Sequence, residues 1–250
     1  MNTEINNDTI AGLIRSNPDL EPVFQHMIKV FNNCTSVFIH ELRNPLTVMK
    51  SMIQYIEYKH PETKKYKYWS QLEPLLMEME CMMADASTLN LCTSIKKEEC
   101  NLLDLLQQVT DNFQPQALSK QMDLSLIISE EDESYYRSYY CDSSKIRQVF
   151  CNLVKNAMEA TKPADYIHIN LGHLPENGSA PAKLSLEFCN NGSLIPEDEI
   201  HTIFNPYVTY KDGGTGIGLA IAERVISLHF GQILVSSTED ETCFTILLPL

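Results

Sequence analysis

The stretch from Leu20 to Tyr58 constrains the fold most strongly, because it contains no glycine and repeats apolar residues at helical spacing. The repeat predicts one long helix with a single buried stripe. The residues of this stripe are Phe38, Leu42, Met49, Met52 and Ile56. If Phe38 and Leu42 occupy heptad positions d and a, His40 falls at f, the position farthest from the seam. We therefore expect His40 to face solvent.

A second apolar stripe follows a break at His60, Pro61 and Glu62, which predicts a helical hairpin. Its members are Leu72, Leu75, Leu76, Met79, Met82, Met83, Ala86 and Leu89. If the arms turn near His60, Pro45 should lie opposite about Leu75. A lone pair of long arms cannot bury its apolar stripe on both sides. We therefore expect two copies of the chain to form a dimeric four-helix bundle.

The second half of the chain alternates between helix and strand patterns. Helices are expected at 102–118, 144–161 and 216–230, and strands at 124–129, up to 141, and at 166–171, 184–189, 232–236 and 242–248. This order predicts an α/β sandwich with helices on one face of a mixed sheet. We divide the chain into a short N-terminal segment 1–19, a helical hairpin 20–95 and an α/β domain 96–250.

Charge and composition exclude several classes of protein. The formal net charge of -14 argues against nucleic acid as a partner, because nothing basic is concentrated enough to follow a phosphate backbone. The apolar runs are only of strand length and the N-terminus is polar, so we expect no membrane span and a cytoplasmic location. The eight cysteines include no pair at CxxC spacing, which favours reduced core thiols over disulfides or a zinc site.

The first motif with reactive side chains is the run from His40 to Pro45 on the predicted long helix. An exposed imidazole is partly uncharged near neutral pH, so its free nitrogen can attack phosphorus. Glu41 can hold the other ring nitrogen and accept its proton, and Asn44 lies one turn further on. The alternative is an ordinary surface histidine followed by an incidental proline kink.

Two further motifs lie in the second half. Asn152 and Asn156 are four residues apart and share one helix face, where two side-chain amides suit a phosphate-bound Mg²⁺. In the segment 211–220, Gly214, Gly216 and Gly218 would let the backbone approach a polyphosphate, and the helix that follows offers free amides to it. A glycine-rich loop alone is a weak indication of nucleotide binding. The three motifs in this order are a strong indication.

Together these motifs resemble those of the two-domain core of bacterial sensor histidine kinases. His40–Pro45 is similar to the H box, Asn152–Ala160 to the N box, Ile203–Tyr207 to the F box and Gly214–Leu219 to the second glycine box. The resemblance implies that 20–95 is a dimerisation and histidine phosphotransfer hairpin. It also implies that 96–250 is a catalytic ATP-binding domain of the Bergerat type.

The family's chemistry carries over residue by residue. His40 would be autophosphorylated by ATP, with Glu41 as its catalytic neighbour, and the phosphoryl group would pass to an aspartate of a response-regulator receiver domain. Asn44 would orient the water that dephosphorylates this partner, and Asn156 would hold Mg²⁺. Related ATPases carry a water-activating glutamate where this chain has Asn152, so transfer is favoured over hydrolysis. The residues expected to bind nucleotide are Asn152, Asn156, Asn190, Gly192, Lys211, Gly214, Thr215, Gly216, Gly218 and Leu219.

The sequence departs from the family pattern in two places. The first glycine box has Asn190 in place of the adenine-reading aspartate and Leu194 in place of the second glycine, although the Asn190 oxygen can still accept a hydrogen bond from the adenine amino group. Fewer than 40 residues precede His40, so we expect no sensor domain and a separate sensory protein as a possible source of input. The open alternatives are a histidine phosphotransferase of a phosphorelay with a weakened ATP site and, third, a dimeric scaffold.

Overall fold

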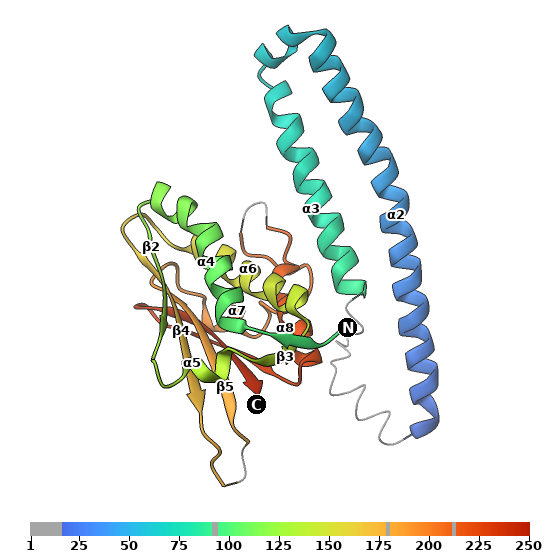
Figure 1. The fold of residues 1–250 in the computed structure, drawn as a ribbon. Helices are drawn as coiled ribbons and strands as arrows, with labels where there is room; N and C mark the ends of the chain where they lie inside the picture. The colour runs from blue at the N-terminus through green and yellow to red at the C-terminus, as the bar shows by residue number, and fades with distance from the viewer. Residues whose placement is uncertain (1–16, 92–94, 179–180, 212–213) are drawn as a thin grey trace. The chain divides into compact units, whose positions relative to one another are not determined.

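The computed structural model describes residues 17–91, 95–178, 181–211 and 214–250 (Figure 1). It divides into two compact units, Met1–Leu91 and Cys92–Leu250. Most of the predicted N-terminal segment, residues 92–94 at the end of the predicted hairpin, and Asp212 and Gly213 of the glycine-rich segment lie outside the described residues. None of the described helices combines the length and the hydropathy that crossing a membrane requires.

The first unit is the predicted helical hairpin. Helix α2 spans Glu21–Lys59 and α3 spans Leu72–Leu91, with short 3-10 helices η1 (Pro18–Leu20), η2 (Pro61–Lys65) and η3 (Trp69–Gln71) before and between them. Lys50 bonds to Glu80 across the two arms at 2.8 Å, and the Trp69 indole donates to the Glu57 carboxylate at 2.9 Å. These two polar contacts set the register of the arms.

The stripe that the sequence predicts to be buried is exposed in this hairpin. Phe38 is 64% exposed and Met52 is 59% exposed, and Leu42, Met49 and Ile56 are exposed as well. A neighbouring row that contains Ile39 and Leu46 is buried instead. A two-helix hairpin covers only one stripe of each arm, and the wide apolar face of α2 offers more than one. His40 is exposed, as the heptad frame predicts.

The predicted pairing of Pro45 with Leu75 is wrong. The Lys50–Glu80 contact implies that residues whose numbers sum to about 130 face each other, which places Pro45 near residue 85. The turn occupies residues 60–71, because η2 and η3 extend it well beyond His60. The sequence signal at His60 marks only where the first arm ends.

The second unit contains the other helices and all the strands of the described chain. The helices are α4 (Leu102–Ser119), α5 (Glu133–Tyr136), α6 (Ser143–Ala160), α7 (Glu197–Ile200) and α8 (Gly218–Leu228). The strands are β1 (Glu98–Cys100), β2 (Asp123–Ile128), β3 (Tyr139–Cys141), β4 (Tyr166–Leu174), β5 (Lys183–Asn190), β6 (Gln232–Ser237) and β7 (Thr242–Pro249). The predicted long helices and strands are confirmed, whereas β1, α5 and α7 were not predicted.

The larger sheet is mixed, as predicted, with the order β2-β4-β5-β7-β6. Strands β2 and β4 are parallel and the other neighbours are antiparallel. Helices α4, α6 and α8 cover one face of this sheet (Figure 1). Alternate strand residues such as Ile169, Leu186 and Ile246 are buried, and the Phe188 ring of β5 lies 5.8 Å from the Phe150 ring of α6. Strands β1 and β3 form a separate two-stranded sheet.

One cysteine pair contradicts the expectation of reduced thiols. Cys189 of β5 and Cys243 of β7 face each other in the strand register and form a disulfide. Cys34, Cys100, Cys141 and Cys151 are free. The pairing was missed because its partners are 54 residues apart and only the antiparallel pairing of β5 with β7 brings them together.

A buried histidine connects α6 to the end of α8. His229 is 1% exposed, and its Nε2 accepts a hydrogen bond from the Asp142 N–H at 3.0 Å. Its Nδ1 lies 2.8 Å from the Val225 carbonyl oxygen, so the neutral ring must carry its proton there. Burial lowers the pKa of His229, because the charged ring would lose its hydration.

This arrangement predicts a pH-dependent stability. Since the pKa of His229 is lower in the folded than in the unfolded chain, the unfolded state binds more protons, and stability falls as pH drops below about 6.5. His229→Gln can still accept the Asp142 bond but does not titrate. We expect urea unfolding between pH 7.5 and 5.5 to show a smaller loss of stability in His229→Gln than in the parent. Equal losses would contradict this role for His229.

Candidate functional site

Helix α6 carries the first part of the site. Asp142 caps its N-terminus by accepting the Lys145 N–H, and the apolar face of the helix packs on the sheet. Asn152 and Asn156 lie on another face and are only half-buried. The Asn152 Nδ2 donates to the Gly218 carbonyl oxygen at 3.0 Å, which fixes the first turn of α8 against α6.

Lys211 meets the same face of α6 one turn further on. Its ammonium donates to the side-chain oxygen of Asn156 and lies 3.2 Å from a carboxylate oxygen of Glu159. Lys155 approaches the other oxygen of Glu159 at 3.9 Å. The Asn156 oxygen is therefore directed at a position that holds a positive charge in this structure.

This position fits a hard divalent cation. Mg²⁺ takes oxygen ligands, and it is usually held by one or two protein oxygens together with substrate phosphates. The Asn156 amide oxygen and the nearby Glu159 carboxylate supply such oxygens, and the Lys211 ammonium stands where a cation is electrostatically favoured. Lys211 can serve a phosphate instead, since an ammonium pairs well with phosphate oxygens.

The described part of the glycine-rich segment forms a close turn before α8. Gly216 has φ +64°, and a Cβ on it would collide with the backbone of Val208. Its carbonyl oxygen accepts the Tyr207 N–H at 2.9 Å, and the Thr215 hydroxyl accepts the Ile217 N–H at 3.4 Å. Among the described residues, no side chain caps the N-terminus of α8, so its first amides, near Gly218 and Leu219, are available to an anion.

The end of β5 contacts the last turn of α6. A Cβ on Gly192 would collide with the Ala160 carbonyl oxygen, and the Ser193 N–H donates to that oxygen at 3.1 Å. Asn191 accepts the Tyr166 N–H at 2.8 Å and so ties β5 to the start of β4. Glycine is required at 192 because the two backbones lie in contact.

Asn190 is a buried residue whose side-chain nitrogen has no partner among the described residues. It is 2% exposed, and its Nδ2 has no hydrogen-bond partner in the described structure. A buried donor without a partner costs about 1–3 kcal/mol, so such a group is expected to serve a ligand. A carboxamide presents an NH₂ donor group beside a carbonyl acceptor, which is the pattern that pairs with an adenine edge.

Residues 152, 156 and 160 recur every four positions and so lie along one side of α6. They contact Gly218, Lys211 and Ser193, respectively. The structure thus brings the N-box residues together with the glycine-rich segment and the end of β5. Glu159 and Thr242 also belong to this region, and the sequence analysis missed both. Thr242 is buried and is the register partner of Asn190. A threonine at an inward-facing position of the predicted strand 242–248 was the sequence feature that could have identified it.

The other predicted catalytic residues lie on α2 in the first unit. His40, Glu41 and Asn44 are all exposed. Pro45 lies inside the helix and has no N–H, so the Glu41 carbonyl oxygen lacks its usual intrahelical donor. The imidazole is open to a phosphoryl donor or acceptor.

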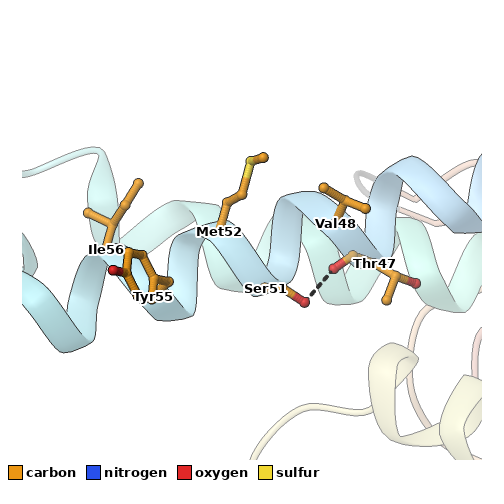
Figure 2. Close-up of a pocket in the computed structure, with 6 residues that line it drawn as sticks. All are labelled: Thr47, Val48, Ser51, Met52, Tyr55 and Ile56. Carbon is orange, nitrogen blue, oxygen red and sulfur yellow. Dashed lines mark hydrogen bonds between the residues drawn. The ribbon is translucent and has the colours of Figure 1, made fainter.

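A shallow apolar depression of about 390 Å³ follows on the same helix. Its lining residues repeat at intervals of four in two rows, Val48, Met52 and Ile56, and Thr47, Ser51 and Tyr55 (Figure 2). Two of its large side chains, Met52 and Tyr55, are 59% and 61% exposed. This surface extends the exposed apolar stripe of α2.

Comparisons with known proteins identify the family. The model described as Histidine kinase-, DNA gyrase B-, and HSP90-like ATPase matches residues 141–250. Sporulation kinase E of Bacillus subtilis (strain 168) is 28% identical over 214 residues, which cover 84% of this chain and 27% of that protein. Sensor protein VanS of Enterococcus faecium is 30% identical over 234 residues, which cover 87% of this chain and 57% of VanS.

Two solved structures of a histidine kinase are also similar to this chain. The catalytic domain of histidine kinase ThkA is 30% identical with a TM-score of 0.53, and the match covers 62% of this chain and 95% of that domain. ThkA in complex with the response regulator protein TrrA is 26% identical with a TM-score of 0.61, over 92% of this chain and 65% of ThkA. The chain spans 27% to 47% of the length of the three sporulation kinases that it matches. It belongs to the family of two-component histidine kinases.

Proposed function

We propose that this chain is an ATP-dependent protein-histidine kinase that phosphorylates its own His40. One observation carries the proposal: three contacts at four-residue intervals along α6 join Asn152, Asn156 and Ala160 to Gly218, Lys211 and Ser193. The adenine would pair with Asn190, and the polyphosphate would meet the Lys211–Leu219 segment and the first amides of α8.

Each residue then has a defined role in the transfer. A nitrogen of the His40 ring attacks the γ-phosphorus, the bond from that phosphorus to the β-phosphate oxygen breaks, and ADP leaves. Glu41 takes the proton from the other ring nitrogen. Bound Mg²⁺, held by Asn156, would neutralise charge on the phosphates. Asn152 supports the site by holding Gly218 and, as an amide, cannot act as a base toward water.

The direct test is incubation with labelled ATP and Mg²⁺. We expect an acid-labile, base-stable label on the parent and none on His40→Gln, because glutamine has no ring nitrogen to attack phosphorus. His60→Gln is the matched control, since it changes an exposed histidine on the turn of the hairpin and should keep the label. A label that persists in His40→Gln would contradict the assignment.

The second part of the proposal concerns the phosphoryl acceptor. A solved relative, ThkA, forms a complex with the response regulator protein TrrA. We propose that phosphorylated His40 passes its phosphoryl group to an aspartate of a receiver domain. We also propose that Asn44 positions the water that hydrolyses the phosphoaspartate of that domain, which releases inorganic phosphate. ATP and receiver domains are found in the cytoplasm, where we place the protein.

A phosphorelay histidine phosphotransferase with a weakened ATP site is the second candidate. Two features favour it: Asn190 lacks the charge of an aspartate, and the side chain of Leu194, at the second glycine position, is 48% exposed. The two functions differ in the phosphoryl donor. A phosphotransferase would be labelled on His40 by a phosphorylated receiver domain but not by ATP.

We also propose that the hairpin dimerises. The exposed apolar residues of α2, together with Leu75 and Met79 of α3, form a surface that a second copy would cover in a four-helix bundle. The Lys50–Glu80 contact holds α2 and α3 of one copy together on a different face from the exposed stripe. The stripe can therefore pack against a second copy of the chain.

Met52→Glu should therefore dissociate the dimer, because it places a charge at the centre of the apolar face. We expect sedimentation analysis to show monomers for Met52→Glu at concentrations where the parent is dimeric. Gln54→Glu adds the same charge at the solvent-facing f position and should leave the dimer intact. Dimers of equal strength in both variants would contradict the proposed interface.

A further inference from the structure

The Cys189–Cys243 disulfide lies directly behind the residues proposed to bind adenine. Cys189 precedes Asn190 on β5, and Cys243 follows Thr242 on β7. Asn190 pairs with Thr242 and Cys189 pairs with Cys243 in the register of these strands. Since successive side chains alternate between the faces of a sheet, the sulfurs lie on the face opposite to Asn190. The disulfide therefore links the two strands at the level of the adenine contact.

The surroundings of the pair suit a dithiol as well as a disulfide. Cys189 is 3% exposed, whereas Cys243 is half-buried and is the more exposed of the two cysteines. A Glu241 carboxylate oxygen lies 3.1 Å from the Cys243 sulfur, where it can accept a hydrogen bond from the reduced thiol. The other oxygen of Glu241 accepts a hydrogen bond from the Tyr166 hydroxyl at 2.9 Å, which holds the carboxylate in place.

The other described thiols differ from this pair. Cys100 and Cys141 lie on the adjacent strands β1 and β3 but remain free. Burial raises the pKa of Cys141 to about 12, so little of it is thiolate near neutral pH. Burial also raises the pKa of Cys151. In a cytoplasmic protein an isolated disulfide is usually catalytic or redox-sensing rather than structural.

We propose that Cys189 and Cys243 form a reversible redox site that sets the affinity of the kinase for ATP. The proposal rests on the ATP site proposed above. A low-molecular-weight thiol attacks the Cys243 sulfur as its thiolate, and the Cys189 thiolate leaves and takes up a proton. A second thiol then displaces Cys243 from the mixed disulfide. Two electrons and two protons pass to the protein, and the small thiol leaves as its own disulfide.

Reduction acts on the adenine contact through the strand pair. In the disulfide form Asn190 is almost fully enclosed and its amide nitrogen has no partner. Two separate thiols need more room than two bonded sulfurs, and Cys189 is almost fully buried, where close packing leaves little space for the added volume. Strands β5 and β7 must separate at this level, which exposes the Asn190 amide to adenine. The reduced form therefore binds ATP more tightly.

The test compares ATP affinity of the full chain before and after treatment with reduced glutathione, by calorimetric titration. Alkylation and mass spectrometry report the state of each cysteine. We expect glutathione to open the bond in the folded protein and to tighten ATP binding about threefold or more. Equal affinity in the two forms, tighter binding by the oxidised form, or a bond that glutathione does not open would each overturn the proposal.

Two variants make the result specific. Cys243→Ala cannot form the disulfide, so its affinity should match the reduced parent and should not respond to glutathione. Cys34→Ser removes an exposed thiol of the first unit and should respond like the parent. If Cys243→Ala does not fold, the comparison of ATP affinity between the oxidised and reduced forms of the parent still tests the proposal. ATP binding that ignores redox state overturns this proposal alone, whereas a chain that binds no ATP in either form overturns the ATP site as well.

Discussion

The hydrogen bond from the Asn152 amide to the Gly218 carbonyl oxygen determines how the rest of the nucleotide-binding unit can be arranged. It joins the middle of α6 to the first residue of α8, so the uncapped amides of α8 are held beside α6. The apolar face of α6 is fully buried against the sheet, which fixes the position of α6. The bond to α6 therefore also fixes the start of α8 relative to the sheet. At the far end of α8, His229 forms a second connection to the N-cap of α6. Helix α8 is therefore held against α6 at both of its own ends.

These connections explain why polar residues of weak helix propensity occur in α6. Asn152 and Asn156 cost helix stability, yet each makes a long-range contact that a better helix former would lose. The Lys211 ammonium compensates the Glu159 carboxylate and occupies the Asn156 oxygen. Binding of a nucleotide with its cation would exchange these partners for phosphate and metal. Among the described residues of the site, the charged groups therefore pair with one another without ligand, and the neutral Asn190 amide is the buried side-chain donor that lacks a partner.

Local patterns made much of this structure predictable. The long α2 helix, the exposed His40 and the main helices and strands of the second unit follow from periodicity and from turn residues. Features that depend on distant partners were not predictable in this way. The β1–β3 pairing, the Cys189–Cys243 disulfide and the isolation of Asn190 arise from strand register. The row of α2 that α3 covers, with Ile39 and Leu46, was not predicted, because its position depends on how the turn at 60–71 sets α3 against α2.

The most direct test of the account is a paired measurement on Asn190→Leu. Leucine repeats the branched heavy-atom skeleton of asparagine and removes a buried polar group that the protein does not satisfy, which offsets the cost of its bulkier methyl groups, so the midpoint of urea unfolding should stay close to that of the parent. The same change removes the proposed adenine contact, so the dissociation constant for ATP should rise about tenfold or more. A stable variant with weakened ATP binding is the predicted result. A variant that binds ATP like the parent would contradict the nucleotide site.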